Sequence, residues 1–184
     1  MEPIRRSVIA GSWYPGDPKT LRKDIETYLS KAQTITDSGK IRALICPHAG
    51  YQYSGQVAAH AYKTIIGKEF KKVIIVAPSH RQHFRGASVF NRGGFETPLG
   101  IVPVDEELCN ALMSKGSHVD FIPQAHAQEH SLEIQLPFLQ YILGEFFLIP
   151  IVMGDQGLDN CRMLSDAIVD TTVHQDVLLI ASTD

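Results

Sequence analysis

The chain has 184 residues, of which 44% are hydrophobic and 20% are charged, and its formal net charge is −3. This length and composition are typical of one globular domain that buries a sizeable core. The 17 lysines and arginines are scattered, which argues against nucleic-acid binding, and no apolar stretch near a strand approaches the roughly 20 residues of a membrane span.

Helix and strand patterns alternate along the first half of the chain. Asp17 is a typical N-cap, and the proline and regularly spaced apolar residues after it predict a helix over residues 18–32. Two apolar, β-branched runs, residues 41–47 and 73–78, predict fully buried strands. Residues 54–67 between them predict a helix, so this part of the chain is expected to be a βαβ unit with parallel strands.

The middle of the chain is less regular. Residues 87–104 contain short β-rich runs around a glycine turn at 91–94, which predict a hairpin or a β-rich excursion at the edge of the sheet. Two helices are expected next, over residues 105–116 and 131–143, and Pro137 is expected to kink the second.

The last third of the chain returns to the alternating pattern. A strand is predicted over residues 147–152, a helix over 158–169 and a further strand over 177–181. The whole pattern predicts an α/β fold with a mostly parallel central sheet and helices on its faces. We expect residues 1–184 to be a single α/β domain. Because the last strand has no helix after it, we also expect the domain to be incomplete at its C-terminus.

The cysteines and the first residues indicate the compartment. Cys46, Cys109 and Cys161 are odd in number and widely spaced, which argues against both a disulfide framework and a cysteine-based zinc site. The chain start has no apolar stretch typical of a secretory signal. We therefore expect reduced thiols and a cytoplasmic protein.

Two histidines follow the two strands of the predicted βαβ unit. His48 comes directly after a proline that ends the first strand, and His80 comes two residues after the proline that ends the second. Ligands of parallel sheets bind beyond the carboxyl ends of the strands, and neutral imidazole is the commonest metal ligand. The pair therefore predicts a metal site, although either histidine alone would suit a hydrogen-bonded loop residue.

Two aspartates occupy similar positions after later strands. Asp155 follows the strand over 147–152, and Asp184 follows the strand over 177–181. Either carboxylate could complete a site of two histidines and one carboxylate, the set that binds non-haem Fe(II) with positions left open. The alternative for each is a helix cap or a hydrogen-bond acceptor behind the site.

Residues 126–130 (HAQEH) match the H-x-x-E-H pattern of inverzincin metallopeptidases. That chemistry requires a helix, whereas this segment follows a proline and carries no apolar stripe, so we expect a loop and disfavour a zinc metallopeptidase. In a loop, His130 beside Glu129 would lie at the mouth of the histidine crevice as a catalytic acid or base, or as a group that orients substrate.

Short motifs that occur in order along the chain resemble one family. They are GSWYP (11–15), PHAGY (47–51), AAHAY (58–62), PSH (78–80), EHSLE (129–133), LPF (136–138) and ASTD (181–184). Together they resemble the Memo-like family, also called the AmmeMemoRadiSam system protein B family. Its fold is similar to that of class III extradiol ring-cleaving dioxygenases, so the resemblance implies a three-layer α/β/α architecture.

The resemblance also implies roles for individual residues. It implies that His48 and His80 are metal ligands, with a cysteine beyond the end of this chain as the third. Trp13 and Tyr53 match residues that line the family pocket and contact a substrate or a tyrosine-containing peptide. Asp184 matches a pocket aspartate, and the histidine that follows it in the family lies beyond this chain.

These observations leave two hypotheses open. The first is a metal-dependent oxidoreductase that uses iron or copper, with His130 and Asp184 as the candidate catalytic residues. The second is a binding or scaffold protein that recognises a small molecule or a peptide through the same pocket. Two imidazoles alone make an underdetermined site, so weak metal retention is expected unless Asp184, Asp155 or His130 completes it.

Overall fold

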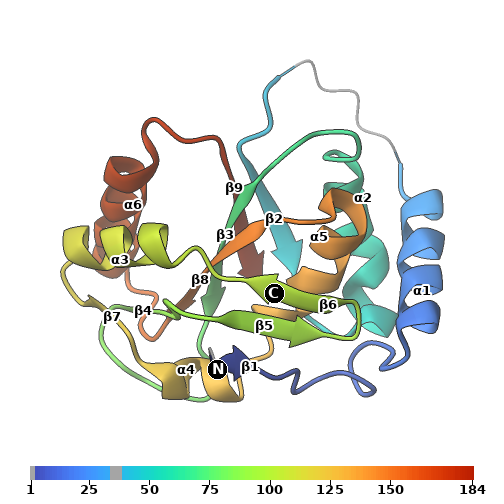
Figure 1. Ribbon diagram of the computed structural model, residues 1–184, viewed down its shortest axis with the longest axis horizontal. Coiled ribbons are helices and arrows are strands. Elements are labelled where there is room, and N and C mark those ends of the chain that lie inside the picture. Colours follow the sequence, from blue (N-terminus) through green and yellow to red (C-terminus); the bar gives the residue numbers. More distant parts are fainter. Residues whose placement is uncertain (1–2, 34–38) are drawn as a thin grey trace.

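The computed structural model describes residues 3–33 and 39–184, and its centre is a six-stranded sheet (Figure 1). The strands lie in the order β2 (Ala43–Pro47), β9 (Val177–Thr183), β3 (Lys72–Pro78), β8 (Phe147–Met153), β4 (Ala87–Val89) and β7 (Val119–Asp120). The first four are parallel, β4 is antiparallel to β8, and β7 is parallel to β4. The predicted α/β fold with a mostly parallel sheet is therefore confirmed.

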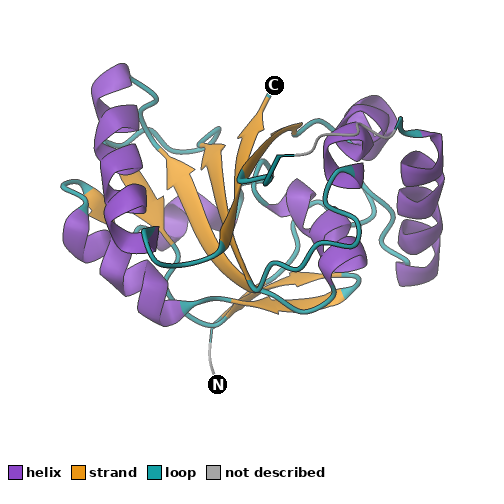
Figure 2. Cartoon of the chain, turned by 90° about the horizontal axis from the view of Figure 1, so that it is seen from above, coloured by secondary structure: helices purple, strands orange, loops and turns teal. Residues whose placement is uncertain are grey.

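Helices cover both faces of this sheet, which makes three layers (Figure 2). One group is α1 (Pro18–Lys31), α2 (Gln56–Lys63) and α5 (Leu136–Leu143), and the other contains α3 (Glu106–Lys115) and α6 (Leu158–Thr172), as Figure 1 shows. A short helix, α4 (Pro123–Ala127), lies near the N-terminal strand. Within residues 3–33 and 39–184, no helix has the length and apolar character that crossing a membrane requires.

The helix α1 forms as its sequence predicts. The Asp17 side chain accepts a hydrogen bond of 2.8 Å from the Thr20 N–H, which satisfies one of the free donors at the helix start. The helix buries Leu21, Ile25 and Leu29 against the layer that contains α2 and α5. Burial of each such side chain stabilises the fold by about 1.5–3 kcal/mol.

The β-rich middle of the chain forms a second sheet of β1 (Ile4–Arg5), β5 (Gly94–Thr97) and β6 (Gly100–Pro103). The hairpin is β5 and β6, whereas the glycine turn that we expected at its tip instead carries the chain from β4 in the main sheet to β5. Gly93 is required there because its φ is +64° and a Cβ would lie 2.0 Å from the Pro3 carbonyl oxygen.

Two predicted helix boundaries are corrected by the structure. A π-helical turn, Tyr51–Gly55, precedes α2, so the helix is shorter than residues 54–67. A single 3₁₀ turn, Glu133–Gln135, precedes α5, which puts Pro137 in the first helical turn. Proline is well tolerated there because its missing N–H would have no helical partner, so it does not kink the helix.

Candidate metal centre

His48 and His80 meet at one edge of the central sheet. His48 directly follows β2 and His80 lies two residues after β3, and their ring centroids are 5.1 Å apart. The two strands are parallel as predicted, but β9 lies between them and pairs with both. The shared direction of the strands therefore delivers both imidazoles to the same place.

His130 adds a third imidazole to this pair. Its ring centroid lies 4.5 Å from that of His80 and 5.8 Å from that of His48. One ligand atom from each ring lies within 4.8 Å of the other two, and in the described ranges these are the only histidine, cysteine or acidic side chains grouped in this way. Three imidazoles could hold an ion such as iron, copper or zinc.

Glu129 fixes the orientation of the His80 ring. The carboxylate is almost fully buried, and its oxygens accept bonds from the His80 N–H at 2.6 Å, the His80 Nδ1 at 2.9 Å and the His130 and Ser131 N–H groups at 2.9 and 3.0 Å. Burial would raise the pKa of Glu129, but these hydrogen bonds lower it to about 2. An ionised carboxylate only accepts hydrogen bonds, so the His80 Nδ1 carries a proton, and in the neutral ring the lone pair is therefore on Nε2.

Ser182, near the end of β9, fixes His48 in the same way. The Ser182 hydroxyl donates its only proton to the Ser131 carbonyl at 2.6 Å, and it accepts from the Gln135 amide at 2.8 Å. The His48 Nδ1, 3.2 Å from this hydroxyl, must therefore be the donor in their contact. Burial lowers the pKa of His48, so the ring is neutral and its Nε2 is free to bind a metal ion.

The two candidate aspartates have different surroundings. An Asp184 carboxylate oxygen lies 2.9 Å from the His48 Nε2 without hydrogen-bond geometry, and the side chain is largely exposed. Asp155 instead accepts bonds from the Gly157 N–H at 2.8 Å and the Asn160 amide at 2.7 Å, at the start of α6. The N-cap of α6 is Gly157, so the expected helix cap is wrong for Asp155, which instead accepts hydrogen bonds in the turn that leads into α6 and is not grouped with the histidines.

A cavity of about 470 Å³ opens beside His48 and His80, and its wall includes Asp184. Trp13 lies against the third histidine, with its ring centroid 4.3 Å from that of His130, and is partly exposed. Tyr53 lies in the π-helical turn with its ring largely exposed. The structure therefore puts Trp13 in contact with the histidine cluster and Tyr53 on the surface.

The H-x-x-E-H segment does not form one metal-binding helix. The expected loop is in part the helix α4, which contains His126 but ends at Ala127, before Glu129 and His130. His126 is buried between Phe90 and Phe95, with its Nε2 3.1 Å from the Ser88 hydroxyl, and it is outside the histidine group. The two histidines of the motif thus have separate surroundings.

Burial of His126 makes the stability of the protein depend on pH. It lowers the pKa of His126 from 6.5 to about 3, so the folded protein binds this proton much more weakly than the unfolded chain. The stability that the neutral His126 contributes is complete above pH 6.5 and is lost as the pH falls toward 3. By pH 4.5 the free energy of unfolding is expected to have fallen by about 2.5 kcal/mol for this reason. We expect urea unfolding to show this loss in the wild type and a loss smaller by that amount in His126→Phe. An equal loss in both proteins would contradict the prediction, and the exposed His174→Ala serves as control.

A buried ion pair below the site was missed by the sequence analysis. The carboxylate of Glu133 is fully buried, pairs with Arg5, and accepts hydrogen bonds from the Tyr14 hydroxyl at 2.7 Å and the Ser7 hydroxyl at 2.5 Å. Arg5 also donates to the Glu129 carbonyl at 2.5 Å. The network joins the N-terminal segment to the segment that carries His130. The signal in the sequence was that Glu133 is the one charged residue of the helix expected over residues 131–143.

Comparison with known proteins identifies the family that the sequence motifs resemble. The family model described as Memo-like protein matches residues 5–184. A MEMO1 family protein of Methanopyrus kandleri is 39% identical over an alignment 191 positions long, which covers 98% of this chain and 68% of that protein. A MEMO1 family protein of Methanothermobacter thermautotrophicus is 35% identical over an alignment 190 positions long, which covers 98% of this chain and 69% of that protein. By its sequence and by the match along nearly all of its length, the chain belongs to the Memo-like family.

Proposed function

We propose that this protein binds one iron or copper ion through His48, His80 and His130 and acts as a metal-dependent oxidoreductase. The observation that carries the proposal is the approach of three imidazole ligand atoms within 4.8 Å of one another. Two of these rings are held so that their Nε2 lone pairs are free. Imidazole suits both iron and copper, and three protein ligands leave coordination positions for a substrate.

The residues around the cluster support this chemistry. When bound, iron or copper would supply the electron-transfer step. Trp13 packs against His130, while the exposed carboxylate of Asp184, 2.9 Å from the His48 Nε2, lies in the wall of the cavity, where it would accept a proton from a substrate. The proposal makes His130 a ligand and gives the role of catalytic base to Asp184.

The single tryptophan of the chain provides the test. Because the Trp13 ring packs against that of His130, with the ring centroids 4.3 Å apart, Fe²⁺ under anaerobic conditions or Cu²⁺ is expected to quench the Trp13 fluorescence with a stoichiometry of one. Zn²⁺, which three histidines also accept, is included as a competitor. Loss of any one of the three ligands is expected to weaken metal binding by more than about 100-fold, in the variants His48→Ala, His80→Ala and His130→Ala. This effect is larger than that of removing a residue that only hydrogen-bonds a metal ligand.

His174→Ala is the matched control, because this histidine is exposed in a turn after α6. Elemental analysis of each purified protein checks the stoichiometry without the fluorescence signal. Metal binding that survives loss of His48 or His80 would refute the site. Oxygen consumption with a phenolic substrate, lost in the same variants, separates turnover from binding.

A second candidate function rests on the aromatic residues near the cluster. Trp13 and Tyr53 are both exposed, and Gly50 lies close to both of them. A Cβ added to Gly50 would lie 3.4 Å from the Trp13 carbonyl oxygen and 3.7 Å from the Tyr53 ring. Such a surface suits a small aromatic molecule or a tyrosine-containing peptide. If the protein is a binding or scaffold protein, a tyrosine peptide is expected to bind equally well after the metal is removed by chelation.

We also infer a cytoplasmic location. All three cysteines are free, including the buried Cys46 and Cys109, which suits a reducing compartment. Cell fractionation with an antibody against the chain tests this inference.

A further inference from the structure

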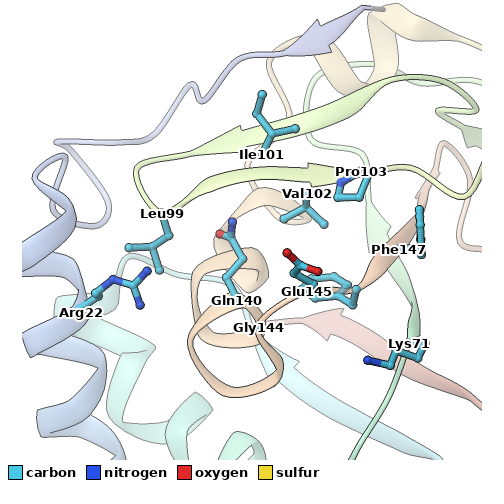
Figure 3. Close-up of a pocket in the computed structure, with 11 residues that line it drawn as sticks. Arg22, Lys71, Leu99, Ile101, Val102, Pro103, Gln140, Gly144, Glu145 and Phe147 are labelled. Atoms are coloured by element: carbon cyan, nitrogen blue, oxygen red, sulfur yellow. The ribbon is translucent and has the colours of Figure 1, made fainter.

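A second cavity lies away from the histidine cluster, at the amino ends of the strands. Its volume is about 720 Å³, and its wall includes residues just before β3 and at the start of β8 (Figure 3). His80 follows the opposite end of β3, so the strand separates the two cavities. Ligand-binding pockets are typically about 300–1,000 Å³, and this cavity falls within that range.

The floor of this cavity is apolar, and two of its large side chains are exposed. Leu99, Ile101 and Val102 come from the β5–β6 hairpin, Phe147 is the first residue of β8, and Phe146 directly precedes it. Ile101 is 55% exposed and Phe147 is 50% exposed. An exposed patch of large apolar side chains is typical of a surface that binds a ligand or a partner.

Charged side chains surround this floor. Arg22 of α1 lies beside Leu99, Lys71 lies near Phe147, and Glu145 lies between them in Figure 3. None of the three forms an ion pair with any residue that the structure describes. Among the described residues the rim thus has two positive charges without an ion-pair partner and one negative charge, a balance that favours an anion.

We propose that this cavity binds a small organic anion whose apolar body lies on Ile101 and Phe147 and whose acid group pairs with Lys71 or Arg22. A carboxylate or sulfonate on an aromatic or aliphatic body meets both requirements. A neutral apolar molecule would leave the two cations without a partner, and an inorganic anion would leave the apolar floor exposed.

Anilinonaphthalenesulfonate is a suitable probe because it joins an aromatic body to one sulfonate. We expect one probe per protein, a fluorescence increase, and binding that weakens as salt screens the charges. The double variant Arg22→Ser, Lys71→Ser is expected to weaken binding about tenfold, because it removes both exposed cations that could pair with the sulfonate. Ile101→Ser is expected to weaken it several-fold, and Glu145→Gln to strengthen it.

The controls use matching residues on α6. Arg162→Ser removes an exposed positive charge and Val169→Ser removes an exposed apolar side chain, and neither is expected to change binding. The neutral analogue phenylnaphthylamine is expected to bind about tenfold more weakly than the sulfonate. The proposal is overturned if the analogue binds as tightly, or if the α6 variants weaken binding as much as those of the cavity. Circular dichroism confirms that each variant is folded.

Discussion

Glu133→Gln is expected to lower the free energy of unfolding by about 3–5 kcal/mol, because it removes one charge from a buried ion pair. Arg5 would remain in the interior without its carboxylate partner, and the hydroxyls of Ser7 and Tyr14 would lose a charged acceptor. Burial and the charge of Glu133 raise the pKa of Tyr14, so its hydroxyl stays protonated and donates at any working pH. Urea unfolding followed by circular dichroism measures the loss.

Lys40→Met provides the control for this experiment. Lys40 pairs with Asp176 at 3.0 Å, but both side chains are more than half exposed, so its loss is expected to cost less than about 1 kcal/mol. The double variant Arg5→Met, Glu133→Leu is expected to lose less than the sum of the two single variants, since it leaves no unpaired charge behind. A Glu133→Gln protein as stable as Lys40→Met would contradict the prediction.

The strands and the two strand-end histidines were predictable because they depend on local patterns. The expected full burial is wrong for residues 41–47, because β2 lies at the edge of the sheet among the described residues and its Ile45 side chain is 72% exposed. A strand that is buried on both faces is apolar along its whole length, as residues 73–78 are, and here its last residue is a proline. The residues after that proline, including His48 and His80, then lie at the carboxyl edge of the sheet. The position of β9 between β2 and β3 was not predictable, because strand order depends on which faces pack together and not on any single segment.

His130 and its supporting residues required the tertiary structure. The sequence placed His130 at the mouth of the crevice, but its distance to the other rings depends on the buried contacts that hold residues 126–133. Ser182 and Gln135 are a single hydroxyl and a single amide in apolar segments, and no spacing distinguishes them from ordinary core polar residues. Their role follows only from the hydrogen bonds that converge on the Ser182 hydroxyl.

Glu129→Gln is expected to weaken metal binding by about 10–100-fold, the usual effect of removing the carboxylate partner of a histidine ligand. With its pKa near 2, Glu129 is ionised at any working pH and accepts the Nδ1 proton of His80. An amide in this position carries no charge and can present its N–H₂ group to the ring, which would turn the His80 lone pair away from the ion. Titration with Cu²⁺ followed by Trp13 fluorescence measures the change, and the exposed Asp159→Asn is the control for loss of a carboxylate.

Ser182→Ala tests the other ring independently. Without its hydroxyl, the His48 Nδ1 loses the acceptor that fixes its proton, so metal binding is expected to weaken about tenfold. The two substitutions act on different ligands, so each is expected to reduce the affinity while the stoichiometry stays at one. If both variants bind copper as tightly as the wild type while His80→Ala does not, the histidines are ligands but their orientation does not depend on these partners. If His80→Ala also binds normally, the ion is held elsewhere and the three-histidine site is wrong.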